Sequence, residues 1–551
     1  MDTDESTRTT PHVGGDSEDG HPILFVNDNN ENDTTTTNDN NHDDNNHDHN
    51  HDNDDDDTRI GTVSSGRFNI LSTMVGGGCL SLPLAFQQSG NALMGPLLLL
   101  LTGVITDFCF RLLVASAVHL HPPHPSRPGK DTFESITSAA FGPKAYVFSM
   151  GLVVLMCFFG AVGYSVLLRD MMEPINDAWA PYIVTTTNHP WLHKNLTMFL
   201  VILLVTPFCT LQHLTALKNC GAASMTSVLI LGSCIVFRSV ECNLNLNNAT
   251  FDLDDQDNGN NDDKDKPWYA YLRFFPEDWR ELLDAIPLFI SCFVCHYNIL
   301  PVHNELRNPT PERVSWWLRS TLLFSCTIYT IIGFAGSAYA KCTSDGVISG
   351  NILLDFDEHD PLLLVGRLCL AVTLTLAFPM LVLPARDITL RSIILPMILA
   401  RRTAAAAASP AVEMEGLQEP LLSDEDPAGN EAEQTTDDGR AGTTSTATNP
   451  SPSFWLRLST SVVIFWSAGV LASLVSSIDV VWDLLGSSLS ILLSYLIPAG
   501  TYLVITKQTD QPYTRRQYWS RFLCWVLLLV FSPLMIVSTG NAVVNTFFQR
   551  N

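Results

Sequence analysis

The first chemically distinctive feature of this chain is a run of three glycines in the middle of an apolar segment. Gly76, Gly77 and Gly78 stand within FNILSTMVGGGCLSLPLAF, and consecutive glycines favour an unwound backbone over a helix. Pro83 follows, and because proline has no N–H, the carbonyl of Cys79 loses its helical partner. An unwound segment offers N–H groups that can bind an anion and carbonyls that can bind a cation.

A second apolar segment, LFISCFVCHYNILPVHNEL, has a polar centre. His296 and Asn298 flank Tyr297 there, and Pro301 frees the carbonyl of Tyr297. Such freed groups are tolerated inside a membrane only where they line a cavity or are buried in protein. His296 is a candidate proton carrier, and the alternative is that it only hydrogen-bonds freed carbonyls.

Both segments belong to a larger set of apolar stretches. A helix of about 20 mainly apolar residues can cross a bilayer. The sequence contains eleven candidates, at 66–86, 92–118, 145–168, 196–213, 220–239, 284–303, 316–339, 362–385, 457–477, 480–505 and 519–545. Stretches such as 97–101 (LLLLL) are too uniformly apolar for a one-sided surface helix. The sequence therefore predicts an all-α polytopic membrane protein rather than a soluble one.

The net charge of −26 lies outside these apolar stretches. Residues 1–57 carry −17, 241–266 carry −6 and 413–440 carry −9, so the remainder is +6. We expect a disordered acidic cytoplasmic tail at 1–58, helices 1–8 within 59–402 with an outside loop at 240–283, a disordered cytoplasmic loop at 403–453, and helices 9–11 within 454–551. A clustered basic surface is absent from the sequence, which argues against nucleic-acid binding.

Basic residues set the orientation. With the N-terminus in the cytoplasm, 19 Lys and Arg near helix ends fall inside and 10 outside, as the positive-inside rule requires. The sequons at Asn195 and Asn248 then face outside and become candidate glycosylation sites. Cys242 and Cys342 also fall in outside loops, where they form either a disulfide or two unpaired thiols.

The two interrupted helices stand five apart in the count. Five is odd, so the second group of five helices enters the membrane from the opposite side, as in an inverted five-plus-five repeat with one extra helix. Paired broken helices at corresponding positions mark the substrate site of many secondary transporters. The alternative is a pair of ordinary kinked helices in an unrelated polytopic protein.

Particular motifs add a family resemblance. Residues 76–85 (GGGCLSLPLA) resemble the helix 1 signature of the amino acid/auxin permease family. Residues 293–306 (FVCHYNILPVHNEL) resemble the sodium-coupled neutral amino acid transporter branch, and 367–384 and 481–502 also fit. The resemblance implies a LeuT-like fold and relatives in vacuolar and lysosomal membranes.

The resemblance also implies a substrate site on the unwound parts of helices 1 and 6. The residues that it assigns to an amino acid's carboxylate and amino groups are Gly76, Gly77, Gly78, Val294, Cys295, His296 and Asn298. In the sodium-coupled branch, an Asn on helix 1 and a Thr on helix 8 help to bind sodium. Here those positions fall on Ser72 and Ala377, with Thr373 and Thr375 nearby. The loss of hard oxygen ligands favours a proton over sodium, with His296 as the titrating group.

The resulting hypothesis is secondary active transport of amino acids, with neutral ones favoured, coupled to H⁺ or Na⁺ without a cofactor or a resident metal. The protein's partners would be an amino acid, the lipid bilayer and any protein that binds the cytoplasmic tail. An amino-acid-sensing receptor on the same scaffold is the alternative. The loops contain no paired metal ligands, nucleotide-binding loop or nucleophile motif, which argues against an enzyme. The sequence leaves open whether the plasma membrane or a vacuolar or lysosomal membrane holds the protein.

Overall fold

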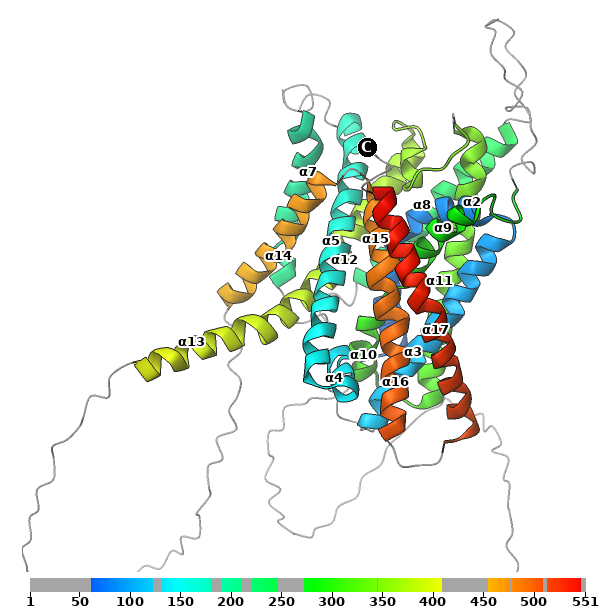
Figure 1. Ribbon diagram of the computed structural model, residues 1–551. Helices are drawn as coiled ribbons and strands as arrows, with labels where there is room; N and C mark the ends of the chain where they lie inside the picture. Colours follow the sequence, from blue (N-terminus) through cyan, green and yellow to red (C-terminus); the bar gives the residue numbers. More distant parts are fainter. Residues whose placement is uncertain are drawn as a thin grey trace, which may run out of the picture. The chain divides into compact units, whose positions relative to one another are not determined.

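The computed structural model describes residues 61–121, 131–179, 190–210, 220–245, 272–343, 345–408, 454–475, 477–508 and 513–546. Within these ranges the chain is helical (Figure 1). The one isolated β-bridge in these ranges joins Gly61 to Leu306. The acidic tail and most of the 403–453 loop lie outside the described residues, as does Asn248. The prediction of an all-α polytopic membrane protein is confirmed.

The apolar helices match the predicted spans closely. Counted as membrane helices along the chain, the full-length ones are α3 (Met94–Leu120; helix 2), α5 (Pro143–Trp179; helix 3), α8 (Cys220–Asn245; helix 5), α11 (Pro311–Ala338; helix 7), α12 (Pro361–Thr389; helix 8), α14 (Phe454–Leu474; helix 9) and α17 (Arg515–Val544; helix 11). In the described residues, nine helices are long and apolar enough to cross a bilayer, and a bent pair makes up to ten. The remaining predicted span, helix 4, corresponds to α7 (Pro190–Val205). Its 16 residues are followed by a 3₁₀ turn at Phe208–Thr210.

Helix 1 is broken in the structure. The helix α1 (Val63–Met74) ends before the glycines, a 3₁₀ turn η1 spans Gly77–Ser81, and α2 (Leu82–Ser89) follows at a bend of 52°. We call residues 75–81 the helix 1 break. Pro83 lies in the first turn of α2, where the missing N–H has no helical acceptor to lose. Proline therefore helps to start the second half-helix.

Helix 6 is also divided into two halves. The helix α9 (Trp279–Ser291) and the helix α10 (His296–Glu305) are separated by residues 292–295, which we call the helix 6 break. Pro301 lies inside α10. Both interrupted helices thus occur at the positions that the sequence indicated.

Helix 10 is less regular than the sequence suggested. It consists of α15 (Ile478–Leu484), two π-helical turns at Leu485–Ser490 and Leu492–Leu496, and α16 (Ile497–Gln508). A side chain at Gly486 would overlap the Pro287 carbonyl on α9, so glycine permits close contact between helices 10 and 6 here. The π turns widen the helix beside the breaks, which is a common feature of functional sites.

Two Arg–Asp pairs occupy equivalent positions in the two halves of the chain. Arg169 on α5 binds Asp170 and donates to the carbonyls of Ala472 and Val475 at the end of α14. Arg386 on α12 binds Asp387 and donates to the Cys209 carbonyl just beyond α7. In each case the third helix of one repeat holds the end of the fourth helix of the other. These reciprocal side-chain contacts between the two halves of the chain support the inverted repeat.

Both arginines are almost fully buried, and helix C-termini carry partial negative charge. The guanidinium groups therefore satisfy carbonyls that a helix end leaves without partners. One contact therefore joins helix 3 to the end of helix 9, and the other joins helix 8 to the end of helix 4.

Two sequence predictions outside the membrane meet different outcomes. Cys242 and Cys342 are joined by a disulfide between the end of α8 and the turn after α11, with Cα atoms 6.5 Å apart. Asn195 lies within α7 and is only 2% exposed, so the structure argues against glycosylation there. A sequon signals an acceptor motif but does not reveal that helical packing covers it.

The Arg386 contact predicts a measurable loss of stability. Substitution of Arg386 by Gln should lower the thermal unfolding midpoint in detergent, because a charged hydrogen bond to a buried carbonyl contributes about 1.5–3 kcal/mol. Arg515→Gln, at an exposed position on α17, is the matched control. Equal midpoints for the two variants would contradict the proposed role of Arg386.

Candidate functional site

The helix 1 and helix 6 breaks face each other. The Cys292 thiol lies 3.3 Å from the Gly78 carbonyl, and an added Cβ at Gly78 would lie 3.6 Å from the Cys292 Cα. The Cys292 carbonyl accepts a hydrogen bond of 2.9 Å from the Tyr329 hydroxyl on α11. Two unwound segments far apart in the sequence thus meet inside the bundle.

Four helix ends converge at these breaks. The N-terminal ends belong to η1, at Gly77, and to α10, at His296, while α1 and α9 end there with their carbonyls. N-terminal ends carry partial positive charge and C-terminal ends partial negative charge. The site therefore suits a ligand with a carboxylate at one place and an ammonium group or a cation at another.

Gly76 is more tightly surrounded than Gly78. A side chain there would overlap the hydroxyl of Tyr164, which reaches the break from α5. The Tyr164 ring lies edge-on to Phe378 of α12, at 6.1 Å, and to Trp482 of α15, at 6.3 Å. Helices 3, 8 and 10 therefore supply an aromatic wall beside the glycines.

The predicted residues of helix 6 are buried around its break. Val294 and Cys295 precede the first turn of α10, and the Asn298 backbone N–H donates to the Cys295 carbonyl at 2.9 Å. The Asn298 side chain lies 3.4 Å from the Thr73 hydroxyl of α1. Asn298 thus connects the inner halves of helices 1 and 6.

His296 is fully buried at the first position of α10. Its ring packs against Phe110 of α3 at 4.5 Å and Tyr495 of helix 10 at 6.3 Å. Among the described residues, neither ring nitrogen has a hydrogen-bond partner. The hydrogen bonds to freed carbonyls, which were the alternative for this residue, are not seen there. A buried polar group without a partner costs about 1–3 kcal/mol, so its presence calls for a functional reason.

The hydroxyls of the candidate ion ligands are hydrogen-bonded to backbone carbonyls, mainly of their own helices. The Ser72 hydroxyl donates to the Asn69 carbonyl within α1, and the Thr375 hydroxyl to the Ala371 carbonyl within α12. The Thr373 hydroxyl contacts the carbonyls of Cys369, at 3.0 Å, and Ser224 of α8, at 3.4 Å. Within the described ranges, neither threonine hydroxyl is hydrogen-bonded to either break.

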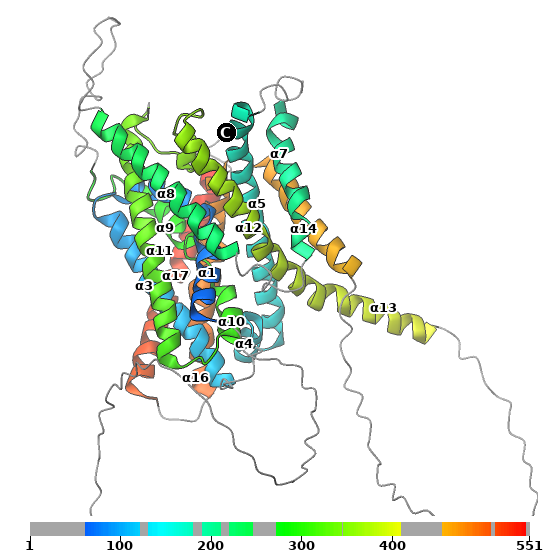
Figure 2. The same ribbon diagram turned by 180° about the vertical axis from the view of Figure 1, so that it is seen from behind.

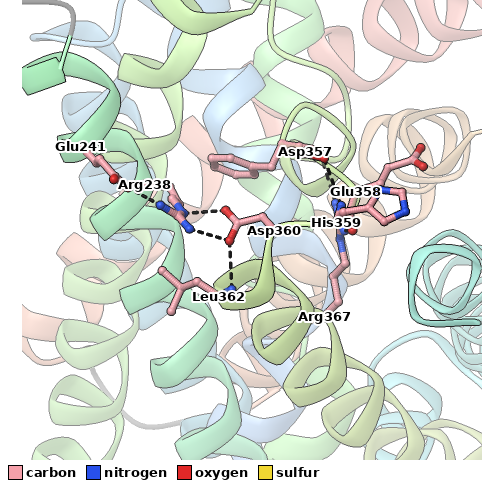
Figure 3. Close-up of polar contacts among 9 residues, drawn as sticks. Arg238, Glu241, Asp357, Glu358, His359, Asp360, Leu362 and Arg367 are labelled. Atoms are coloured by element: carbon pink, nitrogen blue, oxygen red, sulfur yellow. Dashed lines mark hydrogen bonds and ion pairs between the residues drawn. The ribbon is translucent and has the colours of Figure 1, made fainter. Parts of the chain in front are cut away.

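A charged cluster holds the outer end of helix 8 (Figure 3). The Asp360 carboxylate, which caps α12, accepts a hydrogen bond of 2.6 Å from the Arg238 guanidinium of α8. It accepts another of 2.9 Å from the Leu362 backbone N–H. Arg238 also pairs with Glu241. Burial raises the pKa of Asp360, but the bonds from Arg238 and Leu362 outweigh it and leave this pKa below its ordinary value of 3.8.

The loop before α12 is bound from two sides. The buried Arg367 guanidinium donates to the carbonyls of Glu358 at 2.7 Å and Leu353 at 2.9 Å. On the other side, Ser81 of the helix 1 break donates to the Gly350 carbonyl, and the Gln87 side chain bonds Gly346 and Ile348. The outer half of helix 1 is therefore linked to a loop that Arg367, the Arg238–Asp360 pair and the disulfide hold in place.

Sequence reasoning did not identify Tyr164, Phe378, Trp482 or Tyr329 as parts of this region. Each is an aromatic residue in an apolar span, where packing in the core is the ordinary expectation. Only their approach to the breaks distinguishes them. The unusual polarity of a break can be seen in a sequence, whereas the residues that face it from other helices cannot.

Comparison with known proteins supports the same conclusion. The family model described as "Transmembrane amino acid transporter protein" matches residues 59–544. This chain belongs to that family. Its relatives include Vacuolar amino acid transporter 5 of Schizosaccharomyces pombe, 25% identical over 59% of this chain and 68% of that protein.

Two further relatives represent different branches of the family. Vacuolar amino acid transporter 7 of Saccharomyces cerevisiae is 23% identical over 58% of each chain. The Putative sodium-coupled neutral amino acid transporter 11 of Danio rerio is 22% identical over 59% of this chain and 65% of its own length. Some matches thus span less than two thirds of the relatives.

Solved structures share the fold of this family member. MhsT, solved in complex with L-phenylalanine, superposes with a TM-score of 0.52 at 10% identity, over 87% of this chain and 98% of that chain. MHP1, a nucleobase-cation-symport-1 family transporter, gives 0.50 at 11% identity, over 88% and 91%. At such identities the likeness shows the LeuT-like fold alone.

The charge pair at the outer end of helix 8 predicts a pH-dependent stability. A carboxylate whose folded pKa is lowered stabilises the fold above its unfolded pKa and loses this effect as the pH falls through the folded pKa. Asp360→Asn should therefore lower the thermal midpoint at pH 7, and its difference from the unmodified protein should shrink in acid. Glu241→Gln, at a more exposed partner, should change the midpoint less. A difference independent of pH would contradict this role.

The glycine contacts predict a contrast between two neighbouring positions. Gly76→Ala should destabilise the protein by about 1–3 kcal/mol, because its new methyl group overlaps Tyr164. Gly78→Ala places its methyl group at ordinary contact distance from Cys292 and should be tolerated. Thermal unfolding in detergent compares the two, and similar losses would rule out the tight contact with Tyr164.

Proposed function

We propose that this protein transports amino acids across a membrane by alternating access around the two broken helices. The observation that carries the proposal is the meeting of the helix 1 and helix 6 breaks, with two helix N-termini and two helix C-termini at one place. A zwitterion carries the complementary pair of charges. Family membership and the names of the relatives support an amino acid as the substrate.

The substrate's carboxylate would be bound by N–H groups of the helix 1 break, where Gly77 begins η1. Its ammonium group would bind backbone carbonyls at the C-terminal ends of α1 and α9. Val294, Phe378 and Trp482 are apolar, and they would surround an uncharged side chain. A neutral amino acid is therefore the substrate class that we infer.

We infer that a proton drives the transport. A sodium site needs several oxygen ligands, and this chain has Ser72 and Ala377 where the sodium-coupled branch has an Asn and a Thr. His296 occupies a dry aromatic pocket without a hydrogen-bond partner among the described residues. A protonated imidazole is costly there, so protonation would favour a conformation that opens this pocket to water.

The conformational change would involve contacts at both ends of helix 1. At its inner end, Gly61 and Glu305 share a backbone hydrogen bond of 2.9 Å, and the Arg67 guanidinium stacks 4.0 Å from the Trp316 ring. At its outer end, Ser81 and Gln87 bind the loop before α12. Alternating access requires these two sets of contacts to separate in turn. The names of the vacuolar relatives favour a vacuolar membrane as the location, and the plasma membrane is the alternative.

Transport in purified proteoliposomes tests this proposal directly. An inward proton gradient in sodium-free buffer should stimulate uptake of labelled neutral amino acids, with empty liposomes as the control. Amino acid binding without uptake would favour the receptor alternative. Uptake that follows sodium and ignores pH would overturn proton coupling but not transport.

The same assay tests His296. In His296→Gln the response to the proton gradient should fall by at least about tenfold, which corresponds to 1.4 kcal/mol of coupling. Exchange of labelled for unlabelled amino acid at equal pH should persist, because exchange needs no net proton movement. An unchanged pH response would assign the proton to another residue.

A further inference from the structure

Helix 8 continues far beyond the length that a membrane requires. The helix α12 runs from Pro361 to Thr389, a π-helical turn spans Leu390–Ile394, and α13 continues from Leu395 to Ala408. The apolar stretch Pro361–Arg401 alone has 41 residues. At 1.5 Å per residue it would extend about 60 Å, twice the hydrocarbon thickness of about 30 Å. Its last part must therefore lie outside the hydrocarbon core.

The chain has a place to change direction at this boundary. The π-helical turn interrupts the regular hydrogen-bond pattern, and Pro396 follows it at the second position of α13. Prolines and π turns are the ordinary causes of helix bends. In both views α13 leaves the other helices near the starting end of α14 and runs away from the bundle (Figures 1 and 2).

This departing segment is apolar where a helix in water would be polar. Ile393, Met397 and Leu399 are each between 44% and 50% exposed. The substantial packing of α13 within the described residues is with the π-helical turn that precedes it. Exposed aliphatic surface is unfavourable in water by about 25 cal/mol per Å². These side chains therefore need an apolar environment that the bundle does not provide.

The charges at the two ends of this surface are all positive. Arg391 and Arg401 are exposed, and within the described ranges neither forms an ion pair with a carboxylate. No acidic residue occurs in the sequence between Asp387 and Glu413, whereas Arg402 adds a further basic residue. Basic residues beside an exposed apolar helix are the pattern of a helix that lies on an anionic membrane surface.

We propose that Leu390–Ala408 lies in the cytoplasmic lipid–water interface and binds anionic phospholipids. Ile393, Met397 and Leu399 would enter the acyl region, and Arg391 and Arg401 would bind lipid phosphates. Because the segment follows directly on a membrane-spanning helix, it lies close to this surface even if its own affinity for lipid is low. Lipid headgroups would then hold the inner end of helix 8, just beyond the contact of Arg386 with Cys209.

The acidic stretch at 413–440 follows α13 in the sequence and carries a net charge of −9. An anionic surface repels such a stretch, so the proposal requires the lipids, rather than these acids, to be the partners of Arg391 and Arg401. Pairing of the acidic stretch with Arg391 and Arg401 would instead hide the two arginines from the lipids.

The experiment uses the full-length protein with Met397→Cys, labelled with an environment-sensitive fluorophore and reconstituted in vesicles. The vesicles contain phosphatidylcholine alone or phosphatidylcholine with phosphatidylserine, and the protein without the new cysteine, treated identically, provides the blank. Emission at position 397 should shift to shorter wavelength, and doxyl-labelled lipids should quench it. Doxyl-phosphatidylserine should quench at a concentration on the order of tenfold lower than doxyl-phosphatidylcholine.

Substitutions of the arginines test whether Arg391 and Arg401 bind anionic lipid or another partner. Arg391→Gln with Arg401→Gln should remove the preference for phosphatidylserine, whereas Arg515→Gln with Arg516→Gln, exposed on the same predicted face, should keep it. Emission typical of water in both kinds of vesicle would overturn the proposal. So would cross-linking between two copies at position 397, or a phosphatidylserine preference that appears only after deletion of residues 413–440.

Discussion

Every backbone polar group inside a bilayer must find its partner within the protein, and this constraint shapes the structure around the two helix breaks. Where helix 6 unwinds, the Cys292 carbonyl accepts from Tyr329. Where helix 1 unwinds, the Gly76 carbonyl lies 3.0 Å from the Cys79 thiol and the Gly78 carbonyl lies near Cys292. Because these partners come from several helices, an unwound site can exist only inside an assembled bundle.

The same requirement explains the buried arginines. Arg169 and Arg386 bind the carbonyls at the ends of α14 and α7, and Arg367 binds carbonyls of the loop before α12. A guanidinium has five N–H donors, so one side chain can satisfy several acceptors. The contacts of Arg169 join helix 3 to helix 9, and the contact of Arg386 joins helix 8 to the end of helix 4.

The membrane helices could be predicted from the sequence because they depend on local composition. Apolar runs such as 362–385 predicted helices because a helix satisfies its own backbone hydrogen bonds within the bilayer, and α12 includes that range. The helix 1 break was visible because glycine has backbone properties that its neighbours do not change. The helix 6 break, at 292–295, contains neither glycine nor proline and was indicated by the polar residues that follow it. The burial of Asn195 was not visible in the sequence, since its exposure depends on the helices around it.

The sequence by itself determined the helical membrane class, the positions of both breaks and the family of this protein. Tertiary structure alone decided that the breaks meet, that Tyr164 lies over Gly76 and that His296 has an aromatic pocket. It also decided that Thr373 turns toward α8. The physical reason is range: backbone preference and hydropathy act over a few neighbouring residues, whereas a binding site is made of residues that only folding brings together.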